Sequence, residues 1–177
     1  MSTTPPPAIS IWIDDRLVVR RSRIEGRGLF AQEPVSAGTV VIRLGGRLVT
    51  SDELEALIAA ADADPDAPYV DAITVTEDVH LVLPSGTRVH FANHSCDPSL
   101  WHIGPYEIAA RRDLQVGDET TVDYATHSGA DGFAMRCRCG SPVCRGQVTS
   151  QDWRLPELQR RYYGHWVPAL AQCIDRR

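Results

Sequence analysis

Lysine is absent from this 177-residue sequence, and all 18 basic residues are arginines. The α-amino group at Met1, or at Ser2 after processing, is therefore the only amine that the chain offers. There is no long apolar run, which excludes a membrane-spanning helix. Nothing at the N-terminus resembles a signal peptide, so we expect reduced thiols and a cytoplasmic protein.

Acidic residues outnumber basic ones by 23 to 18, which gives a net charge of −5. General nucleic-acid binders are normally basic. We therefore expect no direct nucleic-acid partner. Nine acidic residues lie between positions 52 and 78 with no arginine among them. This stretch is either a solvated helix face or an acidic wall that attracts a basic peptide. Its members are Asp52, Glu53, Glu55, Asp62, Asp64, Asp66, Asp71, Glu77 and Asp78.

Chain length and a hydrophobic content of 43% suffice for one domain with a core. Residues 1–15 are predicted to form a tail, since the run Pro5-Pro6-Pro7 cannot fold alone. Short apolar runs separated by turn residues predict mostly β structure, with strands near 17–19, 39–42, 47–50, 72–76, 80–83, 88–91, 107–110 and 120–122. Helices are predicted over 52–61, with Ser51 as N-cap, and over 155–162 and 166–174.

Four of the five cysteines form a pattern typical of a structural zinc site. Cys137, Cys139 and Cys144 are clustered, with glycine and proline nearby to supply turns, and Cys96 is the candidate for the fourth ligand. This interpretation requires residues near 96 and near 144 to meet in space. The alternative is a set of scattered buried thiols. Cys173 is interpreted as a small apolar residue in the last helix.

Three further motifs stand in a characteristic order. They are Glu25-Gly26-Arg27-Gly28-Leu29-Phe30, then His90-Phe91-Ala92-Asn93-His94-Ser95-Cys96, then Gly117-Asp118-Glu119-Thr120-Thr121-Val122-Asp123-Tyr124. Together with the cysteine cluster, they resemble SET-domain protein lysine methyltransferases that carry a post-SET zinc segment. The resemblance covers roughly residues 16–150.

The resemblance implies a mostly β SET fold, with short twisted sheets around a pseudoknot, a zinc knuckle and C-terminal helices. It also implies a division of the chain. The SET domain would span 16–128, with the acidic insert at about 51–87. The post-SET zinc segment would follow at 129–150, and a helical extension at 151–177.

The same resemblance implies S-adenosylmethionine as cofactor and a lysine-containing, basic protein or peptide as substrate. Tyr124 would be the catalytic residue, aligning the substrate amine, while Glu119 and Asp123 would be structural. Residues expected to contact the cofactor are Gly26, Arg27, Gly28, His90, Asn93, His94, Tyr124, Gln147 and Val148.

Two rival functions remain open at the level of sequence. Leu44 stands where the family usually has a tyrosine of the lysine channel, which is compatible with a non-catalytic relative that binds a peptide, with or without cofactor. A zinc-stabilised interaction module without cofactor is the third possibility. Cofactor binding and methyl transfer separate the three.

Overall fold

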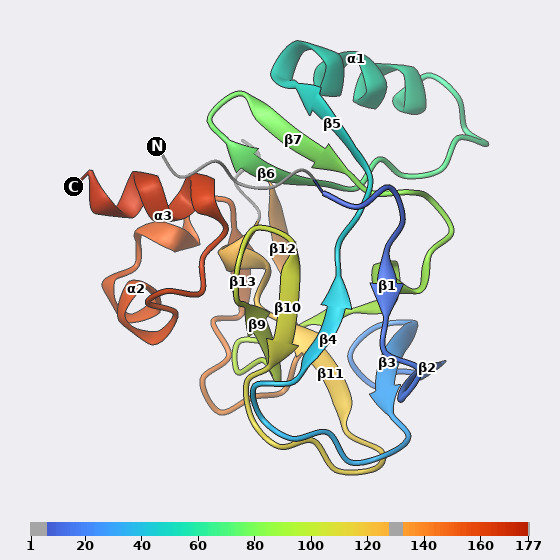
Figure 1. Cartoon of the computed structure of the whole chain (residues 1–177). Helices are drawn as coiled ribbons and strands as arrows, with labels where there is room; N and C mark the ends of the chain where they lie inside the picture. Colours follow the sequence, from blue (N-terminus) through green and yellow to red (C-terminus); the bar gives the residue numbers. More distant parts are fainter. Residues whose placement is uncertain (1–6, 128–132, 177) are drawn as a thin grey trace.

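The computed structural model describes residues 7–127 and 133–176, and its strands form three small sheets and a hairpin (Figure 1). The first sheet has the strand order β1 (Trp12–Ile13), β4 (Val40–Arg43), β10 (Glu107–Ala110) and β9 (Leu100–His102). The second has the order β2 (Leu17–Arg21), β3 (Arg27–Ala31), β11 (Glu119–Val122) and β8 (Asn93–His94). The predicted mostly β SET fold is confirmed in its strand content. The first six residues of the predicted tail lie outside the described ranges.

In the chain, the strands of the third sheet fall between β4 and β8, and the hairpin follows β11. The third sheet has the order β5 (Arg47–Thr50), β7 (Val79–Val82) and β6 (Ala72–Thr76). The hairpin pairs β12 (Ala134–Arg136) with β13 (Gln147–Thr149). The α-helices are α1 (Ser51–Asp62), α2 (Pro156–Arg161) and α3 (Pro168–Asp175). Single 3₁₀ turns are η1 (Arg88–Phe91), η2 (Tyr124–Thr126) and η3 (Asp152–Arg154).

The second sheet brings the three sequence motifs together. Strand β3 carries the glycine motif and pairs antiparallel with β11, where Thr120 lies opposite Leu29. Strand β8 carries the Asn-His motif and pairs parallel with β11, where Val122 lies opposite His94. Tyr124 begins η2 directly after β11. Segments that are far apart in the sequence therefore end beside one another at one edge of the sheet.

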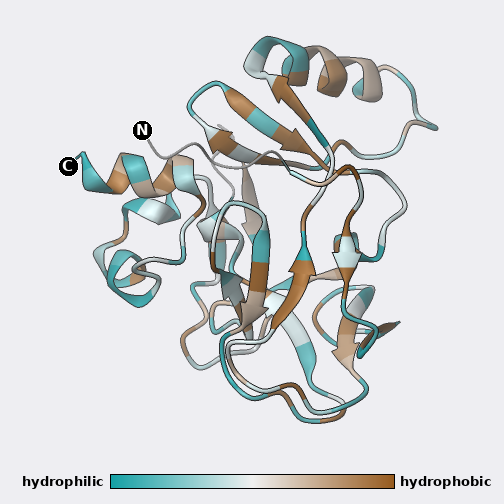
Figure 2. Cartoon of the chain, in the orientation of Figure 1, coloured by the Kyte–Doolittle hydropathy of each residue, from teal (hydrophilic) through white to brown (hydrophobic). Residues whose placement is uncertain are grey.

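The hydrophobic core includes the C-terminal extension as well as the β sheets. Leu17, Leu29 and Ile42 are fully buried in the same cluster as Tyr162 and Leu170. Figure 2 shows hydrophobic residues along β4 and β10, in the middle of the molecule. Helices α2 and α3 lie together on one side of the molecule. Helix α1 lies apart from them, above β5 and β7 (Figure 1).

Two local predictions were wrong. Thr50, not Ser51, caps α1: its hydroxyl accepts the Glu53 N–H and the Glu53 carboxylate accepts the Thr50 N–H, a reciprocal capping box. Residues 88–91 form η1 instead of a strand, because the chain must turn there to direct Asn93 and His94 into the second sheet. Among the described residues, no helix has the length and apolar character needed to cross a membrane.

Candidate functional site

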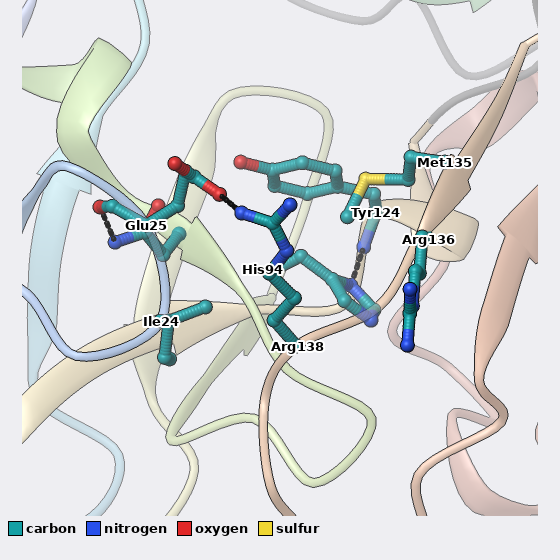
Figure 3. Close-up of a pocket in the computed structure, with 8 residues that line it drawn as sticks. Ile24, Glu25, His94, Tyr124, Met135, Arg136 and Arg138 are labelled. Atoms are coloured by element: carbon teal, nitrogen blue, oxygen red, sulfur yellow. Dashed lines mark hydrogen bonds and ion pairs between the residues drawn. The ribbon is translucent and has the colours of Figure 1, made fainter.

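A cavity of about 180 Å³ lies where the three motifs meet the segment that carries the cysteines. Its lining combines apolar, aromatic, amide and charged side chains of both signs, as Figure 3 shows. The lining residues are Ile24, Glu25, Asn93, His94, Tyr124, Met135, Arg136 and Arg138. Three of the predicted cofactor-contacting residues, Asn93, His94 and Tyr124, are therefore brought together on its wall.

Asn93 holds the glycine loop against β11. Its Nδ2 donates to the carbonyl oxygens of Glu25 (3.2 Å) and Arg27 (3.1 Å) and to Glu119 Oε1 (2.8 Å). A Cβ at Gly28 would collide with the Glu119 carboxylate, so glycine leaves room there for this side chain of β11. Gly26 is required for a different reason, because its φ of 45° lies in the left-handed region. The glycine motif thus shapes the cavity wall through backbone geometry.

The His94 ring is committed to internal contacts. Its Nδ1 accepts the backbone N–H of Tyr124 at 3.2 Å, so the ring proton lies on Nε2, which is 3.4 Å from Cys96 Sγ. Burial lowers the pKa of His94 to about 4, which keeps the ring neutral despite the Asp123 carboxylate at 3.6 Å. His94 therefore connects the backbone at Tyr124 with the cysteine cluster.

Tyr124 presents a neutral hydroxyl. Its Oη donates to the carbonyl oxygen of Ala92 at 3.0 Å, and its ring lies 5.3 Å from the His94 ring, centroid to centroid. Burial, followed by the nearby charge of Asp71, raises the pKa of Tyr124 to about 12. The phenol consequently stays protonated at neutral pH, and it can orient a ligand by hydrogen bonding but cannot serve as a base.

The predicted meeting of Cys96 with the cysteine cluster is confirmed. The sulfur atoms of Cys96, Cys137, Cys139 and Cys144 all lie within 4.8 Å of one another. The distance from Cys96 Sγ to Cys137 Sγ is 3.7 Å. Ligands about 2.3 Å from a tetrahedral zinc ion are about 3.8 Å apart, so this spacing matches a zinc site.

Backbone donors around the sulfurs add to that match. The N–H groups of Arg145, Cys139 and Gly146 point at the sulfurs of Cys96, Cys137 and Cys144 at 3.3 to 3.4 Å. Such donors stabilise thiolates, the form in which cysteine binds metal. Burial acts in the opposite direction and raises the pKa of Cys96 to about 11. The four thiols, their spacing and the backbone N–H groups that point at them therefore fit a closed structural zinc site.

A buried charge network joins this cluster to the rest of the chain. The Arg145 guanidinium donates two hydrogen bonds to the Asp123 carboxylate, both 2.7 Å, and a third to Asp152 at 2.9 Å. The Tyr162 hydroxyl also donates to Asp123, at 2.9 Å. Burial would raise the pKa of Asp123, but Arg145 and the other donors outweigh that effect and lower it. Asp123 is thus structural, as predicted from the motif.

The other predicted cofactor residues lie outside this cavity. The Arg27 guanidinium lies over the Phe91 ring, 4.2 Å from its centroid. His90 Nδ1 is 3.0 Å from Asp71 Oδ2, and its Nε2 donates to the carbonyl oxygen of Pro84. Val148 is fully buried against Cys96 and Cys137, and Gln147 is exposed on β13. The structure therefore does not bring these side chains to the wall formed by Asn93 and Tyr124.

Five lining residues were missed by sequence reasoning: Ile24, Glu25, Met135, Arg136 and Arg138. Two of them could have been predicted from the sequence. Arg136 and Arg138 flank Cys137, so they must lie wherever the cysteine cluster lies. Glu25 directly precedes the glycine motif. Leu44, at the expected position of a channel tyrosine, is buried in the core.

The acidic insert is largely exposed. Helix α1 has no buried residue, and Asp62, Asp64 and Asp66 are all exposed at its end and in the following loop. A second hollow of about 400 Å³ lies there, between the end of α1 and the exposed Tyr69. This part of the molecule presents negative charge to solvent, in agreement with both interpretations made from the sequence.

Comparison with known proteins identifies the family. The SET domain family model matches residues 26–125, more than half of the 177 residues, so the chain belongs to that family. Histone-lysine N-methyltransferase ATX2 of Arabidopsis thaliana is 34% identical over 150 residues, which cover 77% of this chain and 13% of the relative. Histone-lysine N-methyltransferase ash1 of Drosophila melanogaster is 26% identical over 144 residues, covering 76% of this chain and 6% of the relative. The chain thus corresponds to a small part of these relatives.

The fold has a counterpart among solved structures. The methyltransferase domain of human histone-lysine N-methyltransferase SETMAR matches with a TM-score of 0.57 at 23% identity, over 73% of this chain and 56% of that one. The expected cytoplasmic location is contradicted by the relatives, because enzymes named for histone modification point to the nucleus. The N-terminal residues on which that expectation rested could not distinguish these compartments.

Proposed function

We propose that this protein transfers a methyl group from S-adenosylmethionine to a lysine side chain of a protein substrate. One observation carries the proposal. Asn93, His94 and Tyr124, which come from two motifs of the family, line a single cavity. The charged, aromatic and apolar groups of that cavity suit a cofactor that combines a zwitterionic amino-acid end with an adenosine. The names of the relatives support lysine as the acceptor.

The transfer reaction needs no covalent intermediate with the protein. When bound, the cofactor supplies an electrophilic methyl group on a positively charged sulfonium, so no nucleophilic side chain or catalytic metal is needed. The substrate amine must instead be neutral. Lysine has a pKa of about 10.4, so deprotonation at pH 7 costs about 4 to 5 kcal/mol in water. An apolar channel lowers this cost by disfavouring the ammonium form.

Tyr124 supplies alignment. Because its hydroxyl is neutral and held by Ala92, it can hydrogen-bond the incoming amine and fix the direction of attack. It does not take the amine proton, which passes to solvent. The backbone N–H of Tyr124 donates a hydrogen bond to His94 Nδ1, and this bond fixes the position of Tyr124.

The proposal is tested by incubating the purified chain with labelled S-adenosylmethionine and core histones, which are lysine-rich basic proteins. We expect label on histone lysines. The enzyme itself should carry no lysine-bound label, since its sequence contains no lysine, so the background is unusually clean. Cofactor binding without transfer to any added protein would favour the non-catalytic alternative. Label on arginine side chains would contradict the lysine assignment.

We also propose a structural zinc ion held by Cys96, Cys137, Cys139 and Cys144. We expect about one zinc per chain by elemental analysis of the purified protein. Cys139→Ser should lose most of that zinc, because a tetrahedral site cannot close with three thiolates. Cys173→Ser is the matched control and should keep its zinc, since Cys173 lies outside the cluster. Equal zinc in Cys139→Ser and the parent would contradict the ligand assignment.

The acidic insert is proposed to favour basic substrates. Replacing Asp62, Asp64 and Asp66 by asparagine should weaken binding of a Lys/Arg-rich peptide by about fivefold at low salt, because each exposed charge contributes only about 0.2 to 1 kcal/mol. The salt dependence of binding should flatten as well. Fluorescence anisotropy over a salt series measures both. A control triple at Asp15, Glu33 and Glu157, exposed acids elsewhere, should leave affinity nearly unchanged. Equal weakening by both triples would show only a net-charge effect.

A further inference from the structure

One ion pair crosses the candidate cofactor cavity. The Arg138 guanidinium donates to the Glu25 carboxylate, and both side chains line the cavity beside Tyr124 (Figure 3). Both remain about two-thirds exposed, at 63% for Arg138 and 65% for Glu25. An ion pair so open to solvent is weak and screened by salt. The pair can therefore be separated at little cost.

Each partner is presented by a well-held piece of backbone. The Glu25 carbonyl oxygen is held by Asn93, and the turn that contains Glu25 is closed by a hydrogen bond from the Ser22 N–H to the Gly26 carbonyl. Arg138 lies between Cys137 and Cys139, so the cysteine cluster positions it. The two charged side chains thus reach the cavity from separate segments. Glu25 belongs to the glycine motif, and Arg138 belongs to the cysteine cluster.

The cavity lined by the ion pair is smaller than most sites that hold a complete small molecule. Sites for small molecules usually enclose about 300 Å³ or more, whereas this cavity measures about 180 Å³ with the ion pair across it. The amino-acid end of S-adenosylmethionine carries one carboxylate and one ammonium. These are the same two charges that Glu25 and Arg138 offer each other.

We propose that Glu25 and Arg138 exchange partners on cofactor binding, Arg138 taking the ligand carboxylate and Glu25 the ligand ammonium. This inference rests on the proposed function of the cavity and adds the residues that recognise the zwitterionic end. Every charge keeps an opposite partner through the exchange. Arginine suits the carboxylate because its planar guanidinium can donate two parallel hydrogen bonds. The sequence lacks lysine altogether, so arginine is the only permanently cationic side chain available.

Three ligands separate the charges. Calorimetry is carried out with S-adenosylmethionine, with its decarboxylated analogue and with 5′-methylthioadenosine. The decarboxylated analogue keeps the ammonium and the sulfonium but lacks the carboxylate, whereas 5′-methylthioadenosine lacks both the amino-acid end and the sulfonium charge. The variants are Arg138→Gln and Glu25→Gln, each as the full chain with its zinc content measured. Arg136→Gln is the comparison variant, because Arg136 lines the same cavity on the other side of Cys137.

We expect Arg138→Gln to lower the affinity for S-adenosylmethionine by about tenfold or more, as for loss of a charge-assisted pair. Its affinity for methylthioadenosine should stay unchanged, and that for the decarboxylated analogue should not fall. Glu25→Gln should lower affinity for the decarboxylated analogue and leave methylthioadenosine unchanged. Arg136→Gln should change the preference for the carboxylate less than Arg138→Gln does.

Several results would overturn the exchange. Equal losses for all three ligands in Arg138→Gln, with zinc retained, would mean that the pair only closes the knuckle. A carboxylate preference abolished by Arg136→Gln would assign that role to Arg136. An unchanged preference in both arginine variants would also exclude the proposal while leaving cofactor binding intact. Failure of the parent chain to bind S-adenosylmethionine would instead refute the proposed function, and the exchange with it.

Discussion

Replacing Tyr124 by phenylalanine is expected to reduce methyl transfer by about a hundredfold or more while the chain still binds S-adenosylmethionine. Only the hydroxyl that would align the substrate amine is removed, and loss of alignment at a reacting centre has effects of about this size. The same change removes the hydrogen bond to the Ala92 carbonyl, which contributes about 1 kcal/mol to the free energy of unfolding. Single-turnover transfer and calorimetry on one sample separate the two effects.

Tyr162→Phe is the matched control for that experiment. Tyr162 is fully buried, and its hydroxyl donates a hydrogen bond to Asp123. We assign it no part in aligning the substrate amine. We expect it to lower the free energy of unfolding by about 1 to 3 kcal/mol, because a buried carboxylate loses a donor, with turnover nearly unchanged in the folded protein. Equal turnover in Tyr124→Phe and the parent would show that Tyr124 is a packing residue.

The largest loss of stability is expected from Arg145→Leu. That change leaves the carboxylates of Asp123 and Asp152 buried without their shared cation. Breaking a buried ion pair by removing one partner typically costs about 3 to 5 kcal/mol, a large part of the stability of a domain. Urea denaturation in the presence of zinc measures it. Arg145→Lys retains the charge without the forked geometry, so it should lose less stability and keep the comparison measurable if the leucine variant unfolds.

Arg43→Leu provides the contrasting case. Arg43 pairs with Glu107 at 3.0 Å on the surface, and both side chains are about half exposed. Loss of such a pair changes stability by about 0 to 1 kcal/mol. If Arg43→Leu and Arg145→Leu were equally destabilising, the network around Asp123 would not have the special role assigned to it.

Sequence reasoning succeeded where covalent chemistry restricts the choices. A tetrahedral zinc site needs four ligands, so three clustered cysteines predicted a distant fourth ligand, and Cys96 does lie beside them. The order of the three motifs, taken with the cysteine cluster, predicted the family and the fold. It also predicted that Asp123 is structural, which its contacts with Arg145 and Tyr162 bear out.

Sequence reasoning failed where neighbours in space decide the outcome. Thr50 and Ser51 are both good N-cap residues, and only the path of β5 into α1 selects Thr50. The contact of Gly28 with the cofactor stays a prediction, but its packing against Glu119, which comes from a strand far away in the sequence, had no local signal. The role of Glu25 depends on Arg138, more than a hundred residues later, and no local pattern reports such a pairing.

The placement of the C-terminal helices in the main core has a consequence for biosynthesis. Tyr162 and Leu170 are buried in the same cluster as Leu17 and Leu29. A nascent chain emerging from the ribosome therefore cannot close this core until almost all of the 177 residues have been made. Until then its apolar strands lack their final cover, a state prone to aggregation.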